Sequence, residues 1–131
     1  MSMAIKENTN FNKKVTIAEC INNIKEFRYP ESFYKSIDLN LVHFDLWNIM
    51  YADEVEERIK GLKERYPNRK LIPFARRDDN DDIACFEVGK DEKVQIIHDF
   101  ASEGYEQRNE YNDFWDWLKD AIDEMIEFNR E

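Results

Sequence analysis

Glycine and proline are scarce in this chain, with 3 residues of each among 131. A phosphate-binding P-loop needs a cluster of glycines, and so does the dinucleotide-binding fingerprint G-x-G-x-x-G. The glycines lie at positions 61, 89 and 104, too far apart for either motif. Flexible linkers are rich in glycine, serine or proline, so we expect a chain of this length to form one domain.

Cysteine and histidine are also rare, with 2 residues of each. Cys20 and Cys85 belong to no C-x-x-C pair, so we expect buried, reduced thiols rather than a disulfide framework or a zinc site. His43 and His98 lack metal-ligand spacing, and no serine lies in a nucleophile elbow. We therefore expect no catalytic residue, no metal site and no cofactor.

Long apolar runs are missing, and residues 1–14 contain no hydrophobic segment of the kind found in signal peptides. These absences predict a cytoplasmic protein that does not enter membranes. Positive charge is in the minority, because 19 basic residues face 29 acidic ones and the net charge is −10. A polyanion such as nucleic acid is therefore an unlikely ligand by charge, whereas a basic protein surface would be attracted.

Hydrophobic residues nevertheless make up 42% of the chain and aromatic residues 14%, enough to form a packed core. We expect a loosely ordered tail over residues 1–14 and one domain over residues 15–131. Apolar residues at helical spacing predict four helices, of which Thr16 and Asn112 cap the first and the last. The expected helices cover residues 16–27, 31–37, 54–66 and 112–128.

Period-two patterns and short apolar runs bounded by turn residues predict four strands. Short turns between the last three strands indicate an antiparallel meander, followed by a loop over residues 99–111. The expected fold class is α+β, with a single antiparallel sheet and helices packed on one side of it. The expected strands cover residues 44–50, 71–75, 83–88 and 93–98.

Several segments resemble the SUKH superfamily. Tyr29-Pro30-x-x-Phe33-Tyr34 is similar to its aromatic-Pro-x-x-aromatic segment, and Leu71-Ile72-Pro73-Phe74-Ala75 before an acidic turn is similar to its signature strand. Two further strands, a loop and the helix that begins at Phe114-Trp115-x-Trp117-Leu118 follow in the family's order. The resemblance covers residues 28–128. Residues 36–40 replace the family's usual glycine-rich turn, and the acidic turn lacks a glycine.

The resemblance implies an α+β immunity protein that binds the toxin domain of a polymorphic toxin system, often a nuclease or deaminase, without catalysis. The yeast cell-wall synthesis regulator is a distant relative, so a regulatory scaffold with a host partner is the alternative. A third hypothesis, a metal-dependent hydrolase or nuclease, would use Asp91 and Lys93 of a D/E-x-K motif. We expect the protein to act as a monomer or a homodimer.

Two acidic turns and one tryptophan are the candidate partner-binding residues. Asp78, Asn80 and Asp82 match the start of a calcium loop, but Ile83 and Gly89 occupy the positions that need glycine and glutamate. A solvated turn is the simpler interpretation, with contact to a basic toxin surface as an added role. Trp115 is either an exposed interface anchor or packed against the 99–111 loop. The complete candidate set is Asp78, Asp79, Asp81, Asp82, Asp91, Glu92 and Trp115.

Overall fold

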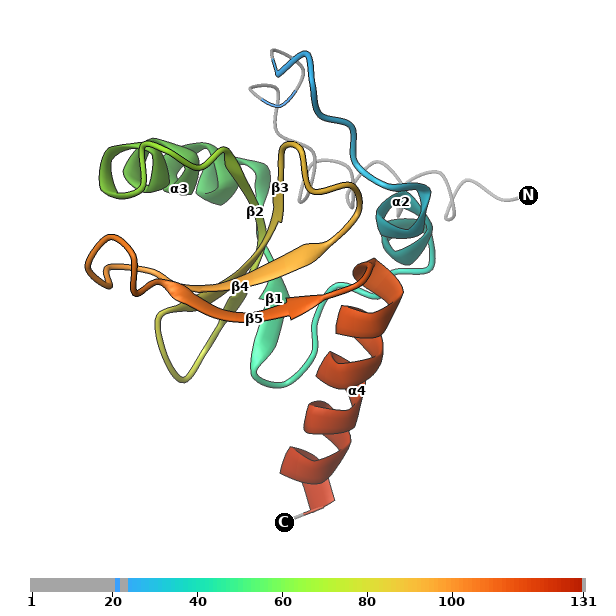
Figure 1. Cartoon of the computed structure of the whole chain (residues 1–131). Coiled ribbons are helices and arrows are strands. Elements are labelled where there is room, and N and C mark those ends of the chain that lie inside the picture. The colour runs from blue at the N-terminus through green and yellow to red at the C-terminus, as the bar shows by residue number, and fades with distance from the viewer. Residues whose placement is uncertain (1–20, 22–23, 131) are drawn as a thin grey trace.

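The computed structural model describes residues 21 and 24–130 and contains one five-stranded sheet with three helices (Figure 1). The strand order is β1-β2-β3-β4-β5, and every neighbouring pair is antiparallel. The α+β class and the antiparallel meander are confirmed. The strands are β1 (Trp47–Ile49), β2 (Leu71–Arg77), β3 (Asp82–Glu87), β4 (Val94–His98) and β5 (Gln107–Tyr111). The helices are α2 (Glu31–Asp38), α3 (Ala52–Arg65) and α4 (Phe114–Arg130).

Several element boundaries differ from the expectation. β1 begins only at Trp47, because Leu46 before it has a positive φ of 86° that interrupts extended backbone. Helix α4 is capped by Asp113 rather than Asn112, since the Asp113 carboxylate accepts a hydrogen bond from the Asp116 backbone N–H at 2.9 Å. The tail expected over residues 1–14 and most of the helix expected over 16–27 lie outside the described residues. Of that helix, residues 24–27 are described and form a turn, so the helix does not extend to Phe27 as expected.

Part of the segment expected as a loop forms β5. Four of its five residues pair with β4, and Arg108 lies at the shift in register. All five are exposed or half-exposed, so they show no apolar alternation that could mark a strand. β5 is an edge of the sheet, and the register with β4 shifts between Ile96 and Ile97. Polar side chains together with such a bulge hinder the addition of a further strand at this edge.

The helices cover both faces of the sheet, so the expectation of helices on one side holds for α2 and α4 but not for α3. Consecutive side chains of a strand point to opposite faces. Arg76 of β2 forms an ion pair with Glu54 of α3 at 3.0 Å, whereas Arg77 forms one with Glu124 of α4 at 2.9 Å. The central strand β3 is buried along its whole length, and two apolar faces require cover from both sides.

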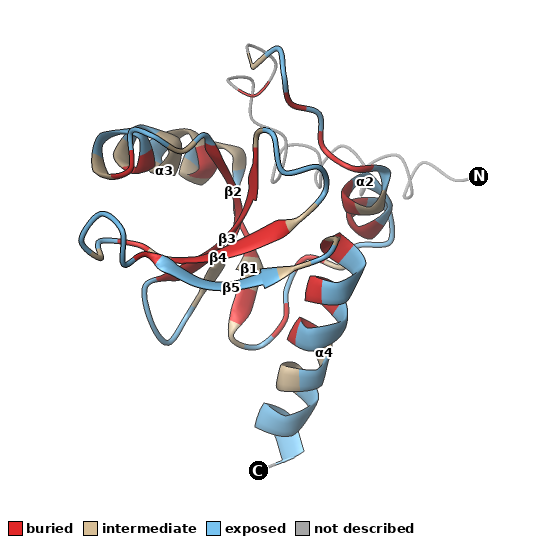
Figure 2. Cartoon of the chain, in the orientation of Figure 1, coloured by how far each residue is buried: buried red, intermediate tan, exposed pale blue. Residues whose placement is uncertain are grey.

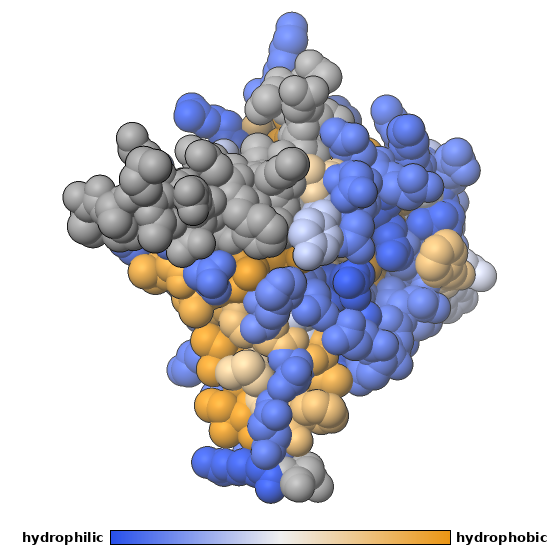
Figure 3. All heavy atoms as spheres, turned by 180° about the vertical axis from the view of Figure 1, so that it is seen from behind, coloured by the Kyte–Doolittle hydropathy of each residue, from blue (hydrophilic) through white to orange (hydrophobic). Residues whose placement is uncertain are grey.

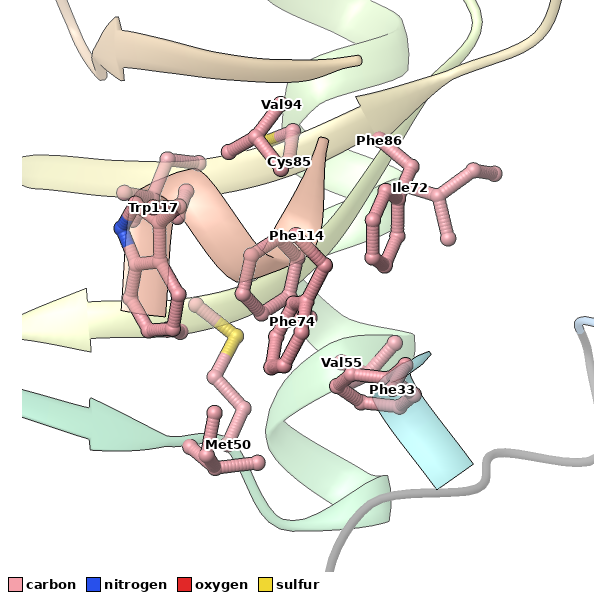
Figure 4. Packing of buried hydrophobic residues seen from close by; sticks show 14 of the residues in the cluster. Phe33, Met50, Val55, Ile72, Phe74, Cys85, Phe86, Val94, Phe114 and Trp117 are labelled. Atoms are coloured by element: carbon pink, nitrogen blue, oxygen red, sulfur yellow. The ribbon is translucent and has the colours of Figure 1, made fainter. Parts of the chain in front are cut away.

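Aromatic rings form the core between the sheet and the helices α2 and α4 (Figure 4). Phe74 of β2 stacks on Phe86 of β3 at 4.6 Å between ring centroids and meets Trp117 of α4 edge-on at 4.9 Å. Phe33 of α2 lies 5.5 Å from Phe114 of α4, so the two helices share this core. Truncation of any one of these buried rings to alanine costs about 3–5 kcal/mol.

Candidate protein-binding surface

The first acidic turn connects β2 to β3, and arginines pair with its leading carboxylates. Asp78 accepts hydrogen bonds from Arg76 at 3.0 Å and from Asn48 at 2.9 Å. Asp79 accepts two hydrogen bonds from Arg77, at 2.8 and 3.0 Å. These bonds from Arg77 lower the pKa of Asp79 below its usual value. The two arginines at the end of β2 thus hold the turn in place.

Asp82 and Asp81 differ sharply in exposure. Asp82 is buried on β3, and its Oδ1 atom lies 3.0 Å from Nδ1 of His98 and 3.1 Å from Nε of Arg108. Asp81 is exposed, and its backbone carbonyl accepts a hydrogen bond from the Asp99 N–H at 3.1 Å. Asp82 is therefore held inside the fold, whereas Asp81 is open to solvent.

Asp91, Glu92 and Trp115 lie at the other end of the sheet. Asp91 and Glu92 are exposed in the turn between β3 and β4, six residues of β3 away from the first turn. Trp115 belongs to the same end, because α4 follows Tyr111, which pairs with Val94 directly after that turn. The Trp115 side chain is 44% exposed. The seven candidate residues therefore form two groups rather than one continuous face.

The structure brings the first turn against a second acidic segment that sequence reasoning missed. The Asp78 N–H donates a hydrogen bond to the Leu46 carbonyl at 2.8 Å, which places the turn beside the loop before β1. The same loop reaches the end of α4, where Asn129 bonds to Asp45 at 2.6 Å. We call the resulting surface the acidic corner, defined by Asp45, Asp78, Asp79, Asp123, Glu124 and Glu127.

Arg77 is the link between the parts of the acidic corner. Its guanidinium group binds Asp79 of the turn and Glu124 of α4, and it lies 5.3 Å above the Trp47 ring. Trp47 in turn donates a long hydrogen bond of 3.4 Å to Glu124. Three guanidinium groups, those of Arg76, Arg77 and Arg130, pair with the corner's six carboxylates among the described residues, so the corner retains negative charge.

The second half of α4 contributes apolar side chains to this region. The buried residues of α4 are confined to its first half, and Figure 2 shows the lower half in the colours of exposed and half-exposed residues. Ile126 and Phe128 are exposed, although their helical spacing suggests a core position. Viewed from behind, hydrophobic surface gathers over the lower part of the molecule with hydrophilic residues beside it (Figure 3). The apolar stripe thus continues past the point where the sheet ends.

A second exposed aromatic segment lies in the connection between β4 and β5. Phe100 is 61% exposed and has a positive φ of 71°, and Arg65 lies 4.2 Å from its ring centroid. Asp99 before it is fully buried and binds Arg58 and Arg65 at 2.7–2.8 Å. Burial alone would raise the pKa of Asp99, but the hydrogen bonds from Arg65 and Arg58 lower it overall. This loop is rigidly held.

Reactive groups are not assembled into a centre in the part of the chain that the structure describes. Over residues 21 and 24–130, no group of three or more His, Cys, Asp or Glu side chains could hold a metal ion. Of the D/E-x-K motif, Lys93 pairs with Glu110 at 3.7 Å, and Asp91 is exposed in the turn. Cys85 is buried, and that burial raises the pKa of its thiol. Cys20 lies outside the described residues.

The geometry thus defines a small α+β protein whose most distinctive described feature is a charged and partly apolar surface. The chain matches the model of the SMI1 / KNR4 family (SUKH-1) over residues 10–120. It therefore belongs to this family, which comprises immunity and regulatory proteins, and the resemblance found in the sequence is confirmed. Comparison with curated proteins and with solved structures finds no match. None of the described helices is long and apolar enough to cross a membrane.

Proposed function

We propose that this protein is an immunity protein that binds and neutralises a cognate protein toxin through the acidic corner. The observation that carries the proposal is the convergence of three chain segments, each bringing carboxylates, on one corner of a SUKH-1 fold. Carboxylates on a protein surface accelerate encounter with a basic partner and fix its orientation. Exposed apolar side chains between them supply the contact area that holds the complex together.

A toxin that acts on nucleic acid fits this surface by charge. Such an enzyme needs a basic groove for the phosphate backbone, and an acidic protein can occupy or block the same groove. Asp78 and Asp79 belong to the corner, and Asp81 extends it along the turn. Asp91, Glu92 and Trp115 form a separate patch that can contact only another part of a large partner. The expected compartment is the cytosol, where a buried thiol such as Cys85 stays reduced.

The test is binding of the cognate toxin domain, recovered by co-purification from the native host and measured by calorimetry and by growth of cells that express the toxin. The variant Asp123→Lys/Glu127→Lys reverses two exposed charges of the corner. Its matched control, Glu57→Lys/Glu64→Lys, reverses two exposed charges of α3, on the opposite face of the sheet. We expect the first variant to lose protection and to bind at least about 100-fold more weakly, and the control to protect cells. Equal loss in both variants would refute the acidic corner as the contact surface.

The alternative is a regulatory scaffold that binds a host protein. Membership of the SMI1 / KNR4 family supports it, because this family comprises regulatory as well as immunity proteins. Co-purification from the native host separates the two functions. Recovery of a toxin-bearing polypeptide supports immunity, whereas recovery of a host protein that is no toxin, without protection in the growth assay, supports the scaffold.

A further inference from the structure

A shallow hollow lies inside the acidic corner, between the loop before β1 and the last turns of α4. Its lining residues are Leu46, Asp123, Glu124, Glu127 and Phe128. Leu46 and Phe128 supply an apolar floor, and the other three residues place carboxylates around it. An apolar surface surrounded by negative charge favours a ligand that combines an apolar stem with a positively charged end.

The residues of the hollow are held in place by contacts within the protein itself. The Leu46 carbonyl accepts the hydrogen bond from Asp78, and Leu46 is only half-exposed. Phe128 is 54% exposed and lies one helical turn after Glu124. Glu124 is itself fixed by Arg77 and Trp47. The loop before β1 and the last turns of α4, which form the two sides of the hollow, are therefore connected to each other and to the sheet.

The rim retains free binding capacity. Within the described part of the chain, Asp123 has no hydrogen-bond or ion-pair partner, and its side chain is exposed. Glu127 pairs with Arg130 at 3.2 Å, but both side chains are about 70% exposed. An exposed pair of this kind contributes less than about 1 kcal/mol and can be exchanged at little cost. Both carboxylates can therefore receive a new cation.

We infer that the hollow receives a lysine or arginine side chain of the protein partner, an inference that rests on the proposed function. The aliphatic stem of such a side chain would cover Leu46 and Phe128, and its charged head would reach the rim. Arginine and lysine also bind favourably over an aromatic face such as that of Phe128. A second copy of this chain is a poor occupant, because each copy carries a net charge of −10.

The first experiment measures toxin affinity for variants that remove charge without reversing it. Asp123→Asn/Glu127→Gln and, separately, Phe128→Ser should each weaken binding by about 10-fold or more, since each deletes one part of the recognition of a desolvated cation. The control Glu57→Gln/Glu64→Gln removes the same charge from exposed positions of α3, on the opposite face of the sheet, and should change affinity by less than about threefold at moderate salt. Equal weakening in the hollow and control variants would overturn the inference.

The second experiment needs no toxin and uses N-acetyl-arginine methylamide as the probe. Amide chemical shifts of the full chain are followed by NMR during titration, with the uncharged N-acetyl-citrulline methylamide as reference. We expect saturable shifts confined to residues 45–47 and 123–129 with the arginine probe only, and their loss in Asp123→Asn/Glu127→Gln. Shifts that are spread over the surface, do not saturate, or persist in that variant would overturn the inference.

The two experiments separate failure of the inference from failure of the proposed function. Saturable arginine binding in the hollow, without any toxin binding, would reject the immunity function and support the cation site. Tight toxin binding that survives Asp123→Asn/Glu127→Gln and Phe128→Ser would support the immunity function and reject the cation site.

Discussion

Replacement of Arg77 by methionine should loosen the acidic corner from the rest of the fold. The Arg77 side chain is 13% exposed, and its guanidinium group binds Asp79, Glu124 and the Trp47 ring. Methionine keeps an unbranched apolar stem of similar reach but removes the charge and every hydrogen bond. The variant therefore tests the polar contacts and leaves most of the packing in place.

The expected loss of stability follows from these contacts. Asp79 is 47% exposed and Glu124 is 37% exposed, so each ion pair is screened by solvent and contributes about 0.5–1 kcal/mol. The cation–π contact with Trp47 adds about 0.5 kcal/mol. Arg77→Met should thus lower the free energy of unfolding by about 1.5–2.5 kcal/mol, which lowers Tm by about 7 °C in a chain of this size.

Urea denaturation gives the stability, and hydrogen exchange of residues 122–130 gives the local effect on α4. Arg76→Met is the matched control, because Arg76 is the neighbouring residue, points to the opposite face and pairs with Glu54 and Asp78. It should cost less than about 1 kcal/mol, since both of its pairs are more exposed, and it should leave exchange in α4 unchanged. An equal loss in the two variants, or unchanged α4 exchange in Arg77→Met, would refute the reasoning.

Two further predictions concern the loop after β4. Asp99→Asn should cost about 3 kcal/mol at pH 7, because it leaves Arg58 and Arg65 without their buried partner. Since the pKa of Asp99 is lowered by folding, this stabilisation is present above about pH 4 and is lost as the pH falls through the folded pKa. Urea titrations should show that the difference in free energy of unfolding between wild type and Asp99→Asn becomes smaller below pH 4. A difference that stays constant with pH would contradict this account. Phe100→Gly should melt at a higher temperature than Phe100→Ala in calorimetry, since only glycine adopts a φ of 71° without strain, and the reverse order would show that the backbone there is unstrained.

Most of the fold could be predicted because its elements carry strong local patterns. β2, β3 and β4 are apolar runs bounded by turn residues, and α2, α3 and α4 lie close to their expected positions. β5 could not be found, because its residues are polar and its pairing with β4 is the only reason it is extended. Helix α3 packs on the second face because β3 is buried on both faces. A short apolar run does not reveal from the sequence whether a strand is buried on one face or on both, so the position of α3 could not be predicted.

The candidate surface could be predicted only in part. The acidic turn could be predicted because Asp and Asn residues cluster between two expected strands. Of the two interpretations given for Trp115, an interface anchor requires an exposed side chain, and the side chain is exposed. The contribution of α4 was hidden, since Phe128 continues the same helical stripe as the buried Phe114. The bridge through Arg77 joins residues 47 positions apart, and such a contact is fixed by the tertiary fold and not by local sequence.

The bulged, polar edge of β5 bears on the concentration that this protein can reach without self-association. The immunity function proposed above requires an excess of this protein over the toxin, so its concentration would have to be high even when no toxin is present. Sheets with smooth apolar edges polymerise under such conditions, because each molecule offers the next one a template. An edge at β5 that hinders the addition of a sixth strand lowers this tendency, so that self-association at this edge interferes less when the protein is abundant.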